Sequence, residues 1–157
     1  MVLKYYKLFV DNKGDIKSFE FDLKDSYYPF LKQKKDEGYK QYLITSDLML
    51  SIIMDFLKDK KYTLISVELY DTDDKDTEEY IKNIFNDFSK DILNEKEIHE
   101  KLNYLESECS IDLTTITIKN SDLGKIILRS NGVFNVGDDF LKEILLNKIK
   151  EVWARND

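Results

Sequence analysis

The sequence predicts an α+β fold in which a mainly antiparallel sheet is backed by helices. Segments typical of hairpins lie near both ends of the chain, and strand–helix–strand repeats are too few for a doubly wound parallel sheet. The apolar pattern also changes repeatedly between the two-residue period of strands and the longer period of helices. The expected order of elements is ββαβαβα(α)βββα.

Length and composition predict one folded domain over residues 1–157. A chain of 157 residues has the usual size of one domain, and with one proline and five glycines it contains no linker-like segment. Its 42% hydrophobic and 13% aromatic residues are far from the composition of disordered chains. We therefore expect a sizeable core.

The first element is a hairpin, because residues 2–10 and 16–23 alternate apolar and polar side chains around a turn-forming segment at 11–15. The alternating apolar residues are Tyr6, Leu8 and Val10 in the first strand and Phe19, Phe21 and Leu23 in the second. This pattern is typical of strands with one dry face and one solvated face.

A short helix should follow the hairpin. Ser26 and Pro29 favour its start, and Gly38 can end it in a left-handed conformation. Residues 39–45 are then predicted to form a strand, and Ser46 is predicted to cap a second helix. That helix has apolar residues at helical spacing, namely Leu48, Ile52, Ile53 and Phe56.

Residues 62–70 alternate as a strand, followed by a polar loop over 71–76. The side chains expected on one side of the strand are Thr63, Ile65, Val67 and Leu69. Asp76 and Glu79 have the spacing of a capping box for the next helix. Its expected apolar stripe comprises Ile81, Ile84, Phe85, Phe88 and Ile92.

Asn94 with Glu97 can cap a further helix, or residues 77–107 can form one long helix; both alternatives fit the pattern. Residues 111–119 are rich in Ile, Leu and Thr and predict a strand. Asn131-Gly132 lies between two further strands, at 125–130 and 133–136, and predicts a hairpin with a type I′ turn. A last helix from Asp138 or Asp139 to Ala154 should close the core.

The excess negative charge of the chain lies in one segment. The net charge is -7, and residues 71–109 hold thirteen acidic residues against five lysines, which leaves the remainder of the chain nearly neutral. A concentrated anionic surface speeds encounter with a basic partner and repels nucleic acid. We therefore expect no direct nucleic-acid binding.

This charge distribution predicts a non-catalytic, acidic protein-binding module that uses the 71–109 helical arm against a basic protein partner. Inhibitor, immunity or anti-defence proteins of a bacterium or mobile element are of this type. The partner-binding residues are predicted to be Asp71, Asp73, Asp74, Asp76, Glu78, Glu79 and Tyr80. Tyrosine near such charge is well suited to anchor an interface.

Cofactor and metal sites are not expected. Neither of the glycine-rich nucleotide-binding motifs occurs, and with one histidine and one cysteine the chain cannot assemble a zinc site of imidazole and thiolate ligands. His99 lies among charged residues and should face solvent, while Cys109 is expected to be a small buried or half-buried side chain. We expect no catalytic residue in the favoured interpretation.

Two alternative functions remain open. Asp15, Asp22 and Lys24 follow the pattern of an acid and then an acid-x-Lys, by which metal-dependent nucleases hold Mg²⁺ and orient water. In a chain with 35% charged residues this spacing also arises by chance. The other alternative is a structural subunit of a larger assembly.

The chain is expected to be cytoplasmic and not bound to a membrane. It lacks an apolar stretch of about 20 residues, and its start, MVLKYYKLFV, has neither the apolar region nor the cleavage site of a secretory signal. One cysteine agrees with a reducing compartment.

Overall fold

The computed structural model describes residues 3–22, 27–71 and 73–156, and within them the chain forms seven strands and five helices. The strands are β1 (Lys4–Val10), β2 (Ile16–Phe21), β3 (Lys40–Gln41), β4 (Tyr62–Leu69), β5 (Leu113–Asn120), β6 (Gly124–Arg129) and β7 (Val133–Val136). The helices are α1 (Tyr27–Asp36), α2 (Ser46–Leu57), α3 (Lys75–Ser89), α4 (Glu95–Glu108) and α5 (Asp139–Asn156).

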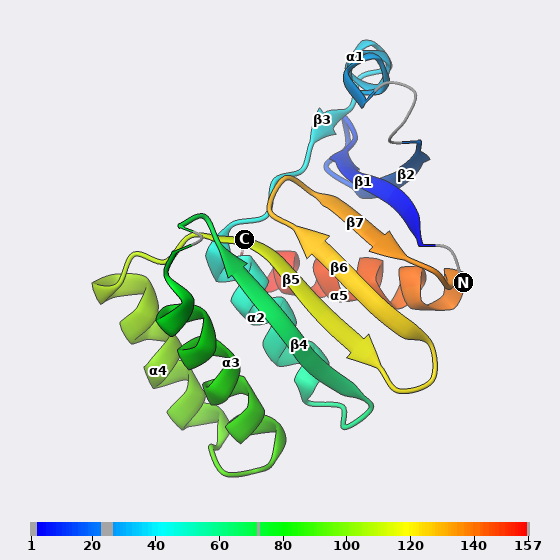
Figure 1. The fold of residues 1–157 in the computed structure, drawn as a ribbon. Coiled ribbons are helices and arrows are strands. Elements are labelled where there is room, and N and C mark those ends of the chain that lie inside the picture. Colours follow the sequence, from blue (N-terminus) through cyan, green and yellow to red (C-terminus); the bar gives the residue numbers. More distant parts are fainter. Residues whose placement is uncertain (1–2, 23–26, 72, 157) are drawn as a thin grey trace.

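All strands belong to one antiparallel sheet with the order β2-β1-β7-β6-β5-β4, and β3 pairs with the end of β1 (Figure 1). Helices α2 and α5 lie together behind this sheet, and α3 runs beside the edge strand β4 with α4 on its outer side. The buried apolar side chains of sheet and helices form one cluster, which includes Leu8, Phe56, Phe85, Phe134 and Leu145. The predicted α+β fold is confirmed.

Strand β1 is buried on both faces, so the expectation of one dry and one solvated face is wrong for it. Tyr6 and Leu8 point into the helix-covered core, yet Lys7 and Phe9 on the other face are also almost fully buried. The ring of Phe9 lies 5.7 Å from that of Phe30 in α1, so α1 forms a second, aromatic layer over this end of the sheet. Leu23 and Ser26 lie outside the described residues.

The strand predicted over residues 39–45 is reduced to the two residues of β3. Beyond β3 the chain stays attached to the sheet through isolated hydrogen bonds, such as the one from the Ile44 amide to the Ser130 carbonyl at 2.8 Å. Thr45, not Ser46, caps α2, because its side chain accepts a hydrogen bond from the Leu48 amide. The Ser46 hydroxyl instead accepts the Leu113 amide at 2.9 Å, which joins the start of α2 to the start of β5.

The buried face of β4 differs from the predicted one. A register shift between Leu64 and Ser66 breaks the strict alternation, so Tyr62 and Leu64 are buried before it while Thr63 is exposed. Val67 and Leu69 are buried beyond it, as expected. A β-bulge adds one residue to one strand, and sequence alternation cannot reveal where that happens.

The helical arm is two helices rather than one. Asn94 and Glu97 form the predicted capping box at the start of α4, with the Asn94 side chain accepting the Glu97 amide at 2.8 Å. The predicted box at Asp76 is wrong, because Asp74 caps α3 by accepting the Thr77 amide. Ile92, expected on the apolar stripe, lies between the helices with 63% of its surface exposed.

The β6–β7 hairpin is confirmed, but its turn is not of type I′. A type I′ turn needs positive φ at both central residues. Gly132 has a φ of 85°, but the φ of Asn131 is not positive. A hydrogen bond from the Gly132 amide to the Arg129 carbonyl closes a four-residue turn, and a left-handed glycine then leads into β7. This is the arrangement typical of hairpin loops one residue longer than the two-residue type.

No helix in residues 3–22, 27–71 and 73–156 combines the length and the apolar character that crossing a bilayer requires.

Candidate functional site

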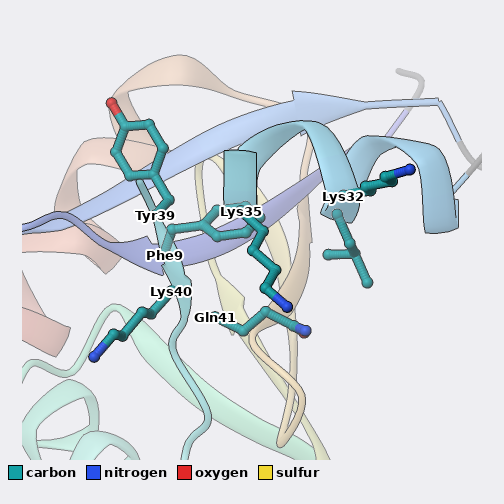
Figure 2. A pocket seen from close by; sticks show the side chains of 7 residues that line it. Phe9, Lys32, Lys35, Tyr39, Lys40 and Gln41 are labelled. Atoms are coloured by element: carbon teal, nitrogen blue, oxygen red, sulfur yellow. The ribbon is translucent and has the colours of Figure 1, made fainter. Parts of the chain in front are cut away.

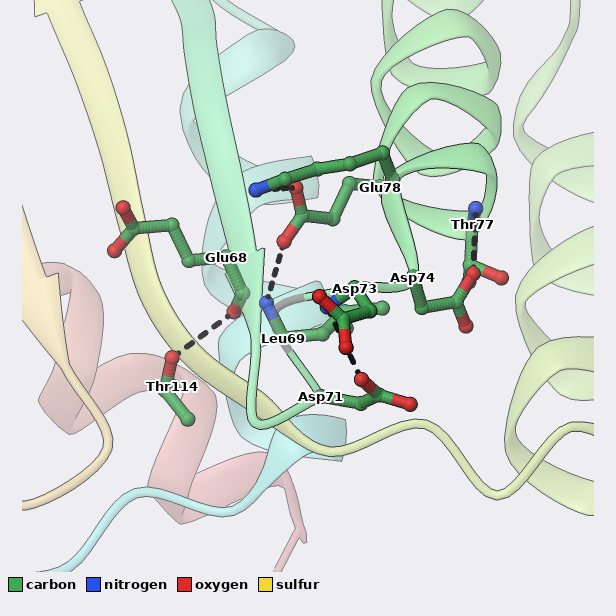
Figure 3. A network of polar contacts seen from close by, with 9 residues as sticks. Glu68, Leu69, Asp71, Asp73, Asp74, Thr77, Glu78 and Thr114 are labelled. Atoms are coloured by element: carbon green, nitrogen blue, oxygen red, sulfur yellow. Dashed lines mark hydrogen bonds and ion pairs between the residues drawn. The ribbon is translucent and has the colours of Figure 1, made fainter.

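The loop between β4 and α3 is held by its own carboxylates (Figure 3). One oxygen of Asp71 accepts the Asp73 amide at 3.1 Å, and Asp74 accepts the Thr77 amide at 3.2 Å. Glu78 turns back from the first turn of α3, where it accepts the Leu69 amide at 3.0 Å and pairs with Lys75 at 3.3 Å. Asp74 and Glu78 are therefore half-buried structural residues.

The other predicted partner-binding residues face solvent. The exposed members of the set are Asp71, Asp73, Asp76, Glu79 and Tyr80. The last of these exposes 41% of its surface, and the neighbouring Tyr70 exposes 77%. The structure thus divides the predicted site into exposed groups that can meet a partner and groups that hold the loop in shape, with the exposed Asp71 doing both.

Pairing of β4 with β5 brings further acidic residues to this end of the molecule. The Tyr70 amide donates to the Asp112 carbonyl at 2.8 Å, which places the exposed Asp112 beside the loop. Glu68, also exposed, is the last residue but one of β4. We call the exposed set the acidic end; it comprises Glu68, Asp71, Asp73, Asp76, Glu79 and Asp112.

Glu68 and Asp112 were not predicted as site residues because they lie outside the acidic segment of the sequence. A pattern read along the chain finds charges that are neighbours in sequence, whereas β pairing makes neighbours of residues forty or more positions apart. The signal that could have found them is the position of each inside a predicted strand, with Glu68 near the end of 62–70 and Asp112 near the start of 111–119.

At the α3–α4 connection, lysines partly balance the negative charge of the helical arm. Lys58 pairs with Glu95 at 3.1 Å, and Lys60 pairs with Asp91 at 3.2 Å, so lysines from the end of α2 balance the α3–α4 connection. His99 is exposed, as predicted. Cys109 is exposed at the end of α4, so the expectation that it is buried or half-buried is wrong.

Two carboxyl groups meet where α4 ends against the start of α2. Burial raises the pKa of Glu106, and the nearby charge of Asp47 and a hydrogen bond with it raise this pKa further. The folded protein therefore holds the Glu106 proton more tightly than the unfolded chain does. Stability is lost as pH rises from the ordinary glutamate value of 4.5 through the raised pKa.

Glu106→Gln should stabilise the protein at pH 7, by about 0.5 kcal/mol, which is typical of a like-charge contact near the surface. The amide removes the repulsion and can still bond to Asp47. The gain should disappear at pH 4, where the wild-type carboxyl is protonated in the folded state. Urea unfolding of both proteins at the two pH values measures this, with the exposed Glu108→Gln as control. A gain that is equal at both pH values would contradict the assignment.

A lysine-rimmed pocket of about 630 Å³ lies between α1 and β3 (Figure 2). Phe9, Leu31 and Tyr39 supply its apolar lining, and the rim carries three exposed lysines and a glutamine, Lys32, Lys35, Lys40 and Gln41. This basic region was not predicted, because Lys40 is separated from Lys32 and Lys35 by Asp36 and Glu37 in the sequence and comes beside them only in the fold.

The residues of the nuclease alternative do not converge. Asp15 precedes β2 and Asp22 follows it, so the strand holds them about 20 Å apart at the usual rise of a strand. Lys24 lies outside the described residues. Within the described part of the chain, no group of three or more His, Cys, Asp or Glu side chains could hold a metal ion.

Comparison of the chain with protein-family models gave no matching family, and comparisons with curated proteins and with solved structures gave no match either. Function is therefore inferred from the side chains and their surroundings.

Proposed function

We propose that the protein is a non-catalytic binding module whose acidic end docks against a basic surface of a partner protein. The observation that carries the proposal is the number of exposed carboxylates at one end of the molecule, contributed by the end of β4, the loop after it, the start of α3 and Asp112, which bonds to the exposed Tyr70. Inhibitor, immunity and anti-defence proteins are the classes that use such a surface.

Rigid anchoring supports this function. The loop backbone is fixed by Asp71 and Asp74, and the Glu78 carboxylate ties α3 to β4, so the exposed groups are held before a partner arrives. Preorganised groups lose less conformational entropy on binding. Tyr70 and Tyr80 add amphipathic contact area, which is how tyrosine anchors many interfaces.

The test uses a charge-reversal variant, Asp73→Lys, Asp76→Lys, Glu79→Lys and Asp112→Lys, which spares the structural Asp71, Asp74 and Glu78. Partners captured by the wild-type protein from its host are purified, and their association rates are measured at low and high salt. The variant should associate at least tenfold more slowly at low salt, and the difference should shrink at high salt because the attraction is screened.

A control with the same change in net charge distinguishes a local surface from the overall field. Glu20, Asp36, Asp122 and Glu151 are exposed and lie elsewhere, so their reversal to Lys should slow association far less. Equal slowing by both variants, or no slowing by the acidic-end variant, would refute the proposal.

A further inference from the structure

A cluster of aromatic and polar side chains lies on the face of the sheet opposite α2 and α5. Tyr5 projects to this face, because its neighbour Tyr6 points into the core and side chains alternate along a strand. The register places Tyr5 beside Phe21 on one side and Asn135 on the other. A cavity of about 240 Å³ opens here, and it is lined by Tyr5, Phe21, Tyr27, Arg129, Asn131 and Val133.

The walls of this cavity are aromatic. The rings of Phe21 and Tyr27 lie 5.3 Å apart, and those of Phe21 and Tyr5 lie 6.0 Å apart. Most of the lining is apolar, and these lining residues include no carboxylate. Such a lining suits a small, flat, apolar body.

The charged group among the lining residues is Arg129, and a hydrogen bond to a buried side chain fixes its position. Its Nη1 donates to the side-chain oxygen of Asn135 at 2.5 Å, and its guanidinium carbon lies 5.9 Å from the centre of the Tyr5 ring. Asn135 is 2% exposed and donates in turn to the Lys4 carbonyl at 3.3 Å. A guanidinium has five N–H donors, so the bond to Asn135 leaves others for a ligand.

A second cation lies beneath the same lining. The fully buried Lys7 donates to the backbone carbonyl of Asn131, a residue of the cavity wall. Both Arg129 and Lys7 therefore bond to neutral oxygen atoms. No ion pair joins either cation to a carboxylate within residues 3–22, 27–71 and 73–156. Buried or half-buried positive charge of this kind gives the cavity a field that favours an anion.

We propose that this cavity binds a small carboxylate with an apolar, planar body, which Arg129 holds through its guanidinium fork. Arginine matches a carboxylate bidentately, and the aromatic walls match the body of the ligand. Inorganic phosphate fits less well, because an apolar lining cannot replace the water that a strongly hydrated dianion gives up. The site is separate from the acidic end and does not depend on it.

Benzoate is the probe that tests this site, in NMR titrations of the full chain at pH 7. Wild-type protein should show saturable shifts centred on Tyr5, Arg129 and Val133. Arg129→Gln should weaken benzoate binding at least tenfold, the loss expected for a charge-assisted pair. Arg129→Lys keeps the charge but lacks the planar guanidinium. Its affinity for benzoate should lie between those of the wild type and Arg129→Gln.

Lys125→Gln is the matched control, because Lys125 lies on the same strand and the same face as Arg129 and its loss changes the net charge equally. It should leave benzoate affinity within twofold of the wild-type value. Ligand-free spectra and thermal unfolding of each variant establish that it is folded. If Arg129→Gln is unfolded, the benzoate affinity of Arg129→Lys and the comparison of benzoate with benzamide test the proposal instead.

The ligand series separates charge from shape. Benzamide, which has the same ring without the charge, should bind at least tenfold more weakly than benzoate. The proposal is overturned by the absence of saturable benzoate shifts, by benzamide binding as tightly as benzoate, by phosphate binding more tightly than either, or by equal effects of Arg129→Gln and Lys125→Gln.

Discussion

Gly132→Ala should destabilise the protein by about 3 kcal/mol or more, through two separable costs. The residue has a φ of 85°, a region in which an L side chain costs about 1–2 kcal/mol. A Cβ at this position would also overlap the Tyr42 carbonyl oxygen, a backbone atom that cannot turn aside, and would lie 3.2 Å from Lys7 Nζ. Overpacking of this kind adds about 1–3 kcal/mol.

Gly124→Ala is the control that isolates the clash. Gly124 has a φ of 101°, but a Cβ there would have no atom within 4 Å, so its substitution carries the backbone cost alone. Urea unfolding of both variants should therefore rank Gly132→Ala well below Gly124→Ala in stability. Equal destabilisation would show that the Tyr42 carbonyl oxygen can move away from a Cβ at position 132.

The Gly132 contact also shows what the sequence can and cannot predict about this fold. Asn131-Gly132 predicts the hairpin, because turn chemistry is local and depends on adjacent residues. The contact with Tyr42 depends on where residues ninety positions away pass over the sheet, and no local pattern encodes that. The same limit explains why β3 is shorter than predicted. Its length is set by how far it pairs with the end of β1, which the alternation of residues 39–45 does not reveal.

The acidic end is partly predictable for the same reason. The composition of residues 71–109 identified the loop and the start of α3, but it did not separate exposed carboxylates from Asp74 and Glu78, whose partners are backbone amides. The cavity at Arg129 was not predicted at all. Its residues come from β1, β2, α1 and the β6–β7 hairpin, and only sheet register makes them neighbours.

Lys7→Met should change stability by an amount that depends strongly on pH. Burial lowers the pKa of Lys7 from its ordinary value of 10.5 to about 8. Between these values the unfolded chain binds a proton that the folded protein does not, so wild-type stability should rise with pH across this window. Below pH 8 the folded protein carries the full cost of a buried ammonium, about 3 kcal/mol for such a shift.

Methionine has a similar length and carries no proton, so Lys7→Met removes this dependence. Relative to wild type, the variant should lose about 3 kcal/mol of stability between pH 7 and pH 10.5, most of it by pH 10. The Asn131 carbonyl loses its donor at every pH, and this adds a constant penalty that does not affect the slope. The difference between variant and wild type, measured by urea unfolding at each pH, is therefore the quantity to follow.

Comparison with a second lysine separates burial from a general effect of lost charge. Lys119 is exposed on the neighbouring strand β5, and Lys119→Met makes the same chemical change there. Titration of the tyrosines, among them Tyr42 with a pKa that burial raises to about 12, affects all three proteins alike and cancels in the differences. A pH slope for Lys7→Met no larger than that for Lys119→Met would mean that water reaches the Lys7 amine. In that case the cation beneath the Arg129 cavity would be hydrated, and the cavity would attract anions through Arg129 alone.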